Sequence, residues 1–308
     1  MRCSRPHYTL DLGVKENGKR NLKFIGFNPD LSSLKQLSAR YGKESIVPLP
    51  CGRCLPCRIA HSKEWAVRCV LESLYYEDNL FLTLTYDDAH LPADGLLQRV
   101  DVQRFIKRLR HHCQFRYFGC GEYGSKNKRP HYHIILFGCS LPDLTPVGAG
   151  LYKSKLIDSL WIDTKTKESL GFNYIGFVSY ASCNYVAGYA TKKVFGDSSD
   201  EFLMASTDPG IGYRWCKEHL EKVLEYDSVF GPFGSQKVAK MPRYFEKMAE
   251  ALDDSKYVEV KARRLSKSTA SNINEMLIHE CDEIEKLLEY KEKITLDEFI
   301  NKKRGKRL

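Results

Sequence analysis

Two histidines separated by one residue, His131 and His133, are the side chains of this sequence best placed to do chemistry. They stand at the start of an apolar run that ends at Gly138, a pattern that predicts a buried β-strand. Alternate side chains of a strand share a face and lie roughly 7 Å apart along the chain. The two imidazoles are therefore predicted to point the same way and to bind one metal ion.

A carboxylate is expected to complete this metal site. Residues 115–124 are rich in aromatic side chains and lead into a basic turn at 124–130, a combination typical of a β-hairpin. In such a hairpin Glu122 would lie across from His131. Imidazole and carboxylate ligands together suit Mg²⁺ or Mn²⁺ better than they suit a metal that prefers thiolates. Alternatively, the two histidines are ordinary surface or core residues.

A second cluster of reactive side chains lies between Asn184 and Gly196. Read as a helix that ends at Gly196, this segment places Tyr185, Tyr189 and Lys192 on one stripe. A phenol has a pKa of about 10, so it is a weak nucleophile at neutral pH unless a base, a cation or a metal-polarised phosphodiester assists it. Alternatively, the two tyrosines only pack a helix against a sheet.

These motifs resemble those of the HUH endonuclease superfamily, which includes rolling-circle replication initiators, relaxases and related transposases. The closer similarity is to the replication initiators of gokushovirus-like microviruses, which are small single-stranded DNA phages. The order of the motifs along the chain is as specific as the motifs themselves. The matching segments are CGRCLPCR (51–58), WAVR (65–68), FLTLTY (81–86), GEYG (121–124), HYH (131–133) and YVAGYATK (185–192).

The resemblance implies a role for each residue at a matching position. His131 and His133 would be paired ligands of a divalent metal, Mg²⁺ or Mn²⁺, and Glu122 would be the third ligand. The segment 81–86 would be a central strand beside the site. On this reading, the metal would polarise a scissile phosphate in DNA.

The tyrosines also receive roles from the resemblance. Tyr189, which begins a Tyr-x-x-Lys motif, would be the leading nucleophile, and Tyr185 would be the second. Lys192 would stabilise the phenolate or the charge that develops on the phosphate. Similar two-tyrosine initiators often carry Lys before the second tyrosine, whereas this chain has Gly188, which leaves Tyr185 without an equivalent local cation.

Strands and helices that alternate around a central hairpin predict an α+β domain built on an antiparallel sheet. The resemblance implies a sheet of about five strands with flanking helices, the RRM-like HUH endonuclease fold. A short helix is expected over 151–161. Three segments are expected along the chain: an N-terminal extension at 1–50, the HUH endonuclease domain at 51–196, and a mainly helical C-terminal region with a basic tail at 197–308.

The function implied by the resemblance is that of a rolling-circle DNA replication initiator. Such an enzyme nicks and rejoins single-stranded DNA at a replication origin through a 5′-phosphotyrosine intermediate. Host DNA polymerase and helicase would be its partners, in the cytoplasm of a bacterial host. Two alternatives remain: a plasmid or transposon HUH nuclease, and a non-enzymatic zinc-dependent nucleic-acid-binding module.

The charge of the chain agrees with an anionic partner. It carries 48 Lys and Arg residues against 39 Asp and Glu residues, a net charge of +9. The candidate DNA contacts are Lys126, Lys128 and Arg129 in the basic turn, and Lys193 next to the tyrosine cluster. No window approaches eighteen uninterrupted apolar residues, so no membrane partner is expected.

Cysteines form the last motif. The count of eleven is odd and no secretory signal fits the start of the chain, which favours reduced thiols over a disulfide framework. Cys51, Cys54 and Cys57 are a candidate structural Zn²⁺ site, although one cluster is less than the two separated pairs of the usual zinc signature. Alternatively, they form a tight turn and the start of a helix. The fourth ligand would come from elsewhere, and the candidates are Cys3, His61, Cys69 or a more distant residue.

Overall fold

The computed structural model of the chain describes residues 3–14, 20–27, 29, 31–42, 45–124, 127–188, 201–230, 237–264 and 284–305. The chain divides into two compact units, residues 1–61 together with 263–308, and residues 62–262. These limits differ from those of the three segments expected from the sequence. The boundaries at 50 and 196 therefore stay a prediction.

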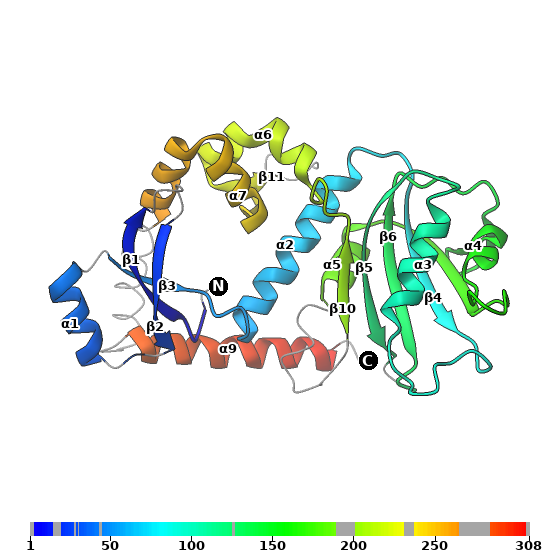
Figure 1. The fold of residues 1–308 in the computed structure, drawn as a ribbon, viewed down its shortest axis with the longest axis horizontal. Helices are drawn as coiled ribbons and strands as arrows, with labels where there is room; N and C mark the ends of the chain where they lie inside the picture. The colour runs from blue at the N-terminus through cyan, green and yellow to red at the C-terminus, as the bar shows by residue number, and fades with distance from the viewer. Residues whose placement is uncertain are drawn as a thin grey trace. The chain divides into compact units, whose positions relative to one another are not determined.

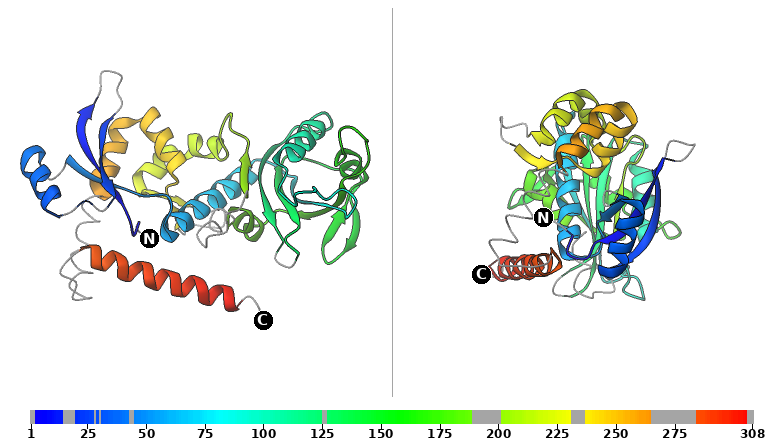
Figure 2. Two further views of the ribbon diagram at one scale, coloured as in Figure 1. Left: turned by 60° about the horizontal axis from the view of Figure 1, so that its bottom comes forward. Right: turned by 90° about the vertical axis from the view of Figure 1, so that its left-hand side faces the viewer.

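The first unit contains a small antiparallel sheet in the order β2-β1-β3, blue in Figures 1 and 2. Its strands are β1 (His7–Val14), β2 (Arg20–Phe27) and β3 (Ile46–Leu49). The helix α1 (Leu31–Tyr41) lies between β2 and β3 in the chain, and α9 (Ile284–Gly305) is a single long helix near the C-terminus. The N-terminal region, expected only as an extension, thus forms regular elements.

The second unit is organised around a seven-stranded sheet in the order β10-β5-β6-β4-β9-β8-β7 (Figure 1). Every pair of neighbouring strands is antiparallel. The α+β class with a central antiparallel sheet is therefore confirmed. The strands are β4 (Asn79–Tyr86), β5 (Arg116–Tyr123), β6 (Pro130–Phe137), β7 (Thr145–Gly148), β8 (Leu151–Lys153), β9 (Gly171–Phe177) and β10 (Phe202–Ala205).

The helix predicted over 151–161 is wrong in its first part. Its first three residues form β8, which pairs with β7 and β9 and extends the sheet beyond five strands. Helix α4 is confined to Lys155–Leu160. Ser154 is its N-cap and accepts a hydrogen bond from the Ile157 amide at 3.1 Å, so the helix starts where a side chain can satisfy its first amides.

One face of the large sheet packs against α3 (Arg99–Leu109) and α4, and Figure 1 shows α3 lying along the sheet. The apolar residues of α3 recur every three or four positions, so they form one buried stripe. The even-numbered residues of β6 from 132 to 136 join the same hydrophobic cluster. This face holds a large hydrophobic core. The stripe consists of Val102, Phe105, Ile106 and Leu109.

The opposite face packs against α2 (Leu55–Ser73) and α5 (Tyr180–Gly188). Successive side chains of a strand alternate between faces, so the odd-numbered residues of β6 from 131 to 137 lie on this side. Ile135 and Phe137 are buried in the hydrophobic cluster of this face. The two histidines continue the same row beyond that cluster, and this placement decides which helix they face.

The remainder of the second unit is mainly helical, as predicted for the C-terminal region. Helices α6 (Tyr213–Tyr226) and α7 (Arg243–Leu252) share a hydrophobic cluster in which the Trp215 and Phe245 ring centroids lie 6.0 Å apart. Within the part of the chain that the structure describes, no helix is long and apolar enough to cross a membrane. A small antiparallel sheet consists of β11 (Ser228–Phe230) and β12 (Lys237–Lys240).

Candidate active site on the central sheet

Strand register brings the predicted metal ligands together. Strands β5 and β6 form the predicted hairpin, and Glu122 is the partner of His131 across it. On the other side of β6, Thr83 of β4 is the partner of His133. Because side chains alternate along each strand, the carboxylate, the hydroxyl and both imidazoles share the face that packs against α5. The predicted hairpin and the position of Glu122 within it are confirmed.

His133 is held at both of its ring nitrogens. Its Nε2 lies 2.7 Å from Oε1 of Glu122, and its Nδ1 lies 3.0 Å from the Thr83 hydroxyl. The side chains of His133 and Glu122 are only 9% and 7% exposed, so the pair is screened from water. Phe81 stacks on the imidazole with 5.6 Å between ring centroids. This imidazole therefore has little freedom to rotate.

His131 is oriented by the backbone. Its Nδ1 lies 2.7 Å from the Arg129 carbonyl oxygen, which can only accept a hydrogen bond, so Nδ1 carries the proton and Nε2 the lone pair. A hydrogen bond of this kind to a backbone carbonyl is a common way to orient a metal-binding histidine. The rings of His131 and His133 are nearly parallel, 18° apart, with 6.4 Å between centroids.

Gly124 is a site determinant that the sequence motifs contained but did not explain. A Cβ at this position would lie 2.9 Å from Cε1 and 3.3 Å from Nδ1 of His131. Any larger residue would therefore displace the imidazole. The hairpin turn itself is closed by a hydrogen bond from the Gly124 amide to the Arg129 carbonyl at 2.9 Å. That carbonyl thus serves both the turn and the orientation of His131.

Tyr185 reaches the same carboxylate from α5. Its hydroxyl donates a hydrogen bond to Oε1 of Glu122 at 3.1 Å. Its ring meets His133 edge-on, with 5.3 Å between centroids, while 49% of the residue stays exposed. A hydroxyl bonded to a buried carboxylate on a half-exposed residue can meet a ligand from solvent. Tyr185 therefore combines access with a partner able to take its proton.

The other predicted residues of the tyrosine cluster lie outside the described residues. The predicted helix is present as α5, which starts at Tyr180 and is described as far as Gly188. The predicted residues beyond or outside it whose positions are not described are Tyr189, Lys192, Lys193 and Lys126.

The basic turn contains two described candidates for DNA contact, and they differ. Arg129 donates from Nη1 to the Tyr86 carbonyl at 2.9 Å and pairs through Nη2 with the Asp88 carboxylate. Its guanidinium thus ties the hairpin to the end of β4. Lys128 is exposed and has a left-handed backbone with φ of 52°. Lys128 is therefore the better placed of the two to meet a phosphate.

The residue between the two histidines faces away from the site. The Tyr132 hydroxyl accepts a hydrogen bond from the Gln98 amide at 2.8 Å and lies 3.1 Å from the Tyr86 hydroxyl. Burial is the main cause that raises the pKa of Tyr132 to about 12 and holds the pKa of Tyr86 well above its usual range. These phenols stay neutral and bind the sheet to α3, since the Tyr86 hydroxyl donates to Asp101 at 2.8 Å.

The donor set on the α5 face fits Mg²⁺ or Mn²⁺ in its chemistry. It offers a carboxylate oxygen and two imidazoles, one of which has its tautomer set by a backbone carbonyl. The direct contact between Glu122 and His133 is the one that an ion bound by both would replace. The three ligand atoms are more widely spaced than those of a closed site, because among the described residues only a group of cysteines has all its ligand atoms within 4.8 Å of one another.

That group of cysteines lies in the first unit and extends the predicted zinc motif. Cys3 completes it, whereas Cys69, another candidate for the fourth ligand, is fully buried in a hydrophobic cluster of the second unit. The four side chains whose sulfur atoms lie within 4.8 Å of one another are Cys3, Cys51, Cys54 and Cys57.

Comparison with known proteins places this geometry in context. The family model described as replication-associated protein ORF2 matches residues 79–194, the segment that contains β4, both histidines and α5. Replication-associated protein VP4 of Bdellovibrio phage phiMH2K is 34% identical over 264 residues, covering 79% of this chain and 80% of the relative.

Two further relatives span most of this chain. Replication-associated protein ORF2 of Spiroplasma virus 4 is 33% identical over 302 residues, 87% of this chain and 88% of the relative. Replication-associated protein ORF4 of Chlamydia phage 1 is 30% identical over 266 residues, 78% of this chain and 65% of the relative. No solved structure gives a significant match to the chain.

Proposed function

The chain belongs to the family of phage replication-associated proteins, and on that premise we propose that it initiates rolling-circle replication by nicking and rejoining single-stranded DNA at a viral origin. One observation carries the proposal. The hydroxyl of Tyr185, the carboxylate of Glu122 and the imidazole of His133 form a continuous hydrogen-bonded group on one face of the sheet. This group combines a nucleophile, a proton acceptor and metal-binding atoms.

The reaction is a transesterification at phosphorus. A tyrosine hydroxyl attacks the scissile phosphate, the bond from its oxygen to phosphorus forms, and the bond from phosphorus to the 3′ oxygen breaks. The 5′ end of the DNA stays linked to the protein and a 3′-hydroxyl is released for a polymerase. Because the phosphoester bond is retained in the link, rejoining needs no ATP.

The proton of the nucleophile has a defined acceptor when Tyr185 attacks. Oε1 of Glu122 lies 3.1 Å from the tyrosine oxygen, which is within reach for general-base catalysis. Thr83 and Phe81 hold the neighbouring imidazole, so the carboxylate stays aimed at the hydroxyl. Low exposure of the pair keeps water from competing for the proton.

His131, His133 and Glu122 would hold the divalent ion, Mg²⁺ or Mn²⁺. When bound, such an ion polarises the scissile phosphate and offsets the charge that develops on it. The protein's contribution is to orient the ligands: the Arg129 carbonyl fixes the tautomer of His131, and Thr83 fixes the ring of His133.

Two tyrosines allow the reaction to be repeated without release of the first product. In this proposal Tyr189 makes the first cut and Tyr185, four residues earlier in the sequence, cuts the regenerated origin while the first link persists. Lys192 stabilises the phenolate or the phosphate charge. Host polymerase extends the 3′-hydroxyl, and a host helicase separates the strands.

DNA contact is proposed for the basic residues around this face. Lys126, Lys128 and Arg129 precede the histidine strand, and Lys193 follows the tyrosine cluster. Phosphate contacts of this kind position the strand without reading its sequence. The net charge of +9 adds a general attraction that weakens with salt.

The test is formation of a covalent DNA adduct. The full chain is incubated with labelled cognate single-stranded genome and Mn²⁺, and products are separated on a denaturing gel and mapped by peptide mass. The variants are Tyr189→Phe, Tyr185→Phe and the double substitution. Tyr226→Phe is the matched control, because Tyr226 is an exposed tyrosine on α6, 57% exposed.

An adduct at Tyr189 or Tyr185 that disappears in the double variant, persists in Tyr226→Phe and is abolished by EDTA supports the proposal. An adduct that survives in the double variant would show that another residue is the nucleophile. Cleavage that persists in EDTA would exclude the metal-assisted step. DNA binding without any cleavage of the genome would favour a binding module instead.

A further inference from the structure

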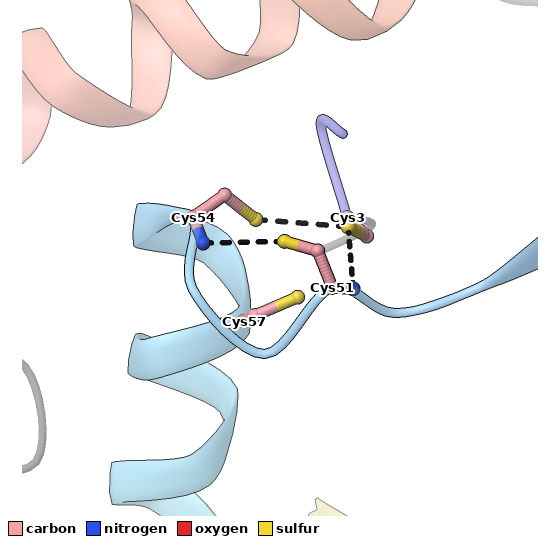
Figure 3. Close-up of side chains that lie close together, drawn as sticks. All are labelled: Cys3, Cys51, Cys54 and Cys57. Carbon is pink, nitrogen blue, oxygen red and sulfur yellow. Dashed lines mark hydrogen bonds between the residues drawn. The ribbon is translucent and has the colours of Figure 1, made fainter. Parts of the chain in front are cut away.

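A group of four cysteines in the first unit is not used by the proposed nicking chemistry. Cys54 is the residue before α2, Cys57 lies in its first turn, Cys51 lies in the preceding loop, and Cys3 comes from the N-terminal segment. Figure 3 shows the four sulfur atoms converging on one point from these separate segments. All four ligand atoms lie within 4.8 Å of one another.

The spacing of the sulfur atoms matches a tetrahedral thiolate site. A zinc ion with four Zn–S bonds of about 2.3 Å requires sulfur atoms about 3.8 Å apart. The Sγ atoms of Cys3 and Cys54 lie 3.7 Å apart. A disulfide would need a separation of about 2.05 Å, so this arrangement is not that of an oxidised pair.

Backbone amides surround the sulfur atoms in the way that favours thiolates. The Cys51 amide donates to Sγ of Cys3 at 3.2 Å, and the amides of Arg53 and Cys54 donate to Sγ of Cys51 at 3.4 and 3.3 Å. Two of these bonds are drawn in Figure 3. Such donors, together with the positive end of the α2 dipole, stabilise negative charge on sulfur.

The turn between Cys51 and Cys54 depends on Gly52. Its φ is +70°, a left-handed conformation that side chains with a Cβ rarely adopt. A Cβ there would meet nothing within 4 Å, so the requirement for glycine is conformational and not steric. The backbone is thus shaped to turn both thiols toward the same point.

The first unit also lacks the usual source of stability. The three clusters of buried hydrophobic side chains found among the described residues draw only on residues 66–260, which belong to the second unit. Small units with little core are commonly stabilised by a structural metal or by disulfides. A metal here would tie residue 3 to residues 51–57 and so hold the ends of the small sheet.

We propose that Cys3, Cys51, Cys54 and Cys57 bind one Zn²⁺ as four thiolates. Four protein ligands leave no open position, so the ion is structural and takes no part in DNA cleavage. The sequence motif supplied three ligands in one short loop, and the fold supplies the fourth from 48 residues away. Each thiol releases its proton when it binds the ion.

The test measures metal content and thiol protection on the full chain. Protein purified without chelator is analysed for zinc and iron by mass spectrometry, and the thiols are alkylated before and after zinc removal and mapped by peptide mass. The expected result is one zinc per chain, with protection from alkylation confined to the four named cysteines. This measurement uses the wild-type chain and does not depend on any variant folding.

Variants then assign the fourth ligand. Cys3→Ser is expected to weaken zinc binding by ~100-fold or more, since one of four ligands is lost. Cobalt substitution should give the intense absorption of a tetrahedral thiolate site in wild type and a shifted, weaker spectrum in Cys3→Ser. Cys113→Ser is the matched control, because Cys113 is also partly buried and lies outside the group.

The proposal is overturned by any of three results. They are a wild-type chain that binds neither zinc nor cobalt, a chain that carries iron in place of zinc, and a Cys3→Ser variant whose zinc affinity and cobalt spectrum match wild type. None of these readouts uses DNA cleavage. Failure of this proposal is therefore distinguishable from failure of the proposed function.

Discussion

The two groups of candidate metal ligands in this protein are built in different ways. The site on the large sheet offers three ligands beside a tyrosine that is 49% exposed, whereas the cysteine group offers four ligands within 4.8 Å of one another. An open set with a nearby nucleophile suits chemistry on a substrate, and a closed set suits structure. The difference teaches that ligand number and access, more than ligand type, separate the two roles.

The largest effect that would test this comparison is expected for Glu122→Gln. The amide keeps the size of the side chain but cannot take a proton from Tyr185 or bind a cation as an anion. We expect the rate of adduct formation to fall by about 10²–10⁴-fold, the range for loss of a general base. The rate is measured by single-turnover cleavage of labelled single-stranded DNA.

Two controls accompany this variant. Glu168→Gln changes a carboxylate whose side chain is 67% exposed and should leave cleavage within about threefold of wild type. Zinc content should be the same in both variants, because the cysteine group shares no ligand with the sheet site. A Glu122→Gln enzyme that cleaves at the wild-type rate would remove this carboxylate from the mechanism.

A smaller effect is expected for Thr83→Val, which removes the hydroxyl bonded to Nδ1 of His133. Thr83 touches neither substrate nor metal in our proposal, so it is a positioning residue. We expect the Mn²⁺ concentration for half-maximal cleavage to rise by about 10–100-fold, as for other residues that orient metal ligands. Titration of Mn²⁺ in the cleavage assay measures this shift.

Rescue separates positioning from a general structural effect of Thr83. Thr83→Ser keeps the hydroxyl and should restore most of the metal dependence. Thr85→Val makes the same change two residues along β4 and should shift the metal dependence little. Equal shifts in all three variants would indicate damage to the strand instead of loss of one hydrogen bond.

The next effect in size is expected for Gly124→Ala. The added Cβ would lie 2.9 Å from Cε1 of His131, so the imidazole must move by a few tenths of an ångström. We expect cleavage to fall by about 10-fold, because small misplacements of catalytic groups are costly. Gly176→Ala is the control, since the nearest atom to its Cβ would be 3.8 Å away. Equal rates for the two variants would mean that the site tolerates the displacement.

The smallest effect is expected on the opposite face of β6, where Tyr132→Phe removes hydrogen bonds to Gln98 and Tyr86. We expect the free energy of unfolding to fall by about 1 kcal/mol while cleavage is unchanged. Denaturant unfolding and the cleavage assay measure the two quantities. A loss of cleavage without a loss of stability would show that the two faces of the sheet are coupled.

The pH dependence of this variant has a defined sign. The pKa of Tyr132 is raised to about 12 by burial, so the folded state keeps a proton that the unfolded state loses near pH 10. The stabilisation is complete below about pH 10 and is lost as the pH rises toward 12. Unfolding measured from pH 8 to pH 11 should therefore show a shallower alkaline loss in Tyr132→Phe than in wild type.

Prediction from sequence succeeded where the chemistry depends on neighbouring strands. The relationship to microvirus replication proteins, the hairpin and the place of Glu122 opposite His131 were all predicted and confirmed. Prediction was wrong for the helix over 151–161, because a strand of three residues is too short to leave a periodic signal. The small sheet of the first unit was missed apart from the region of β2.

The sequence by itself determined that His131 and His133 share a face and that an apolar strand follows them. Strand geometry repeats every two residues, so this information is local and survives without the rest of the fold. The same holds for the turn at Gly52, which brings Cys51 and Cys54 together within four residues.

Tertiary structure alone decided which distant groups complete each set. Thr83 reaches His133 from 50 residues away, Tyr185 reaches Glu122 from 63 residues away, and Cys3 joins Cys51 from 48 residues away. Such contacts depend on which strands pair and which helix covers a face, and these are outcomes of burying the whole core at once. Local periodicity sets the direction of each side chain, and packing of the complete chain decides what it meets.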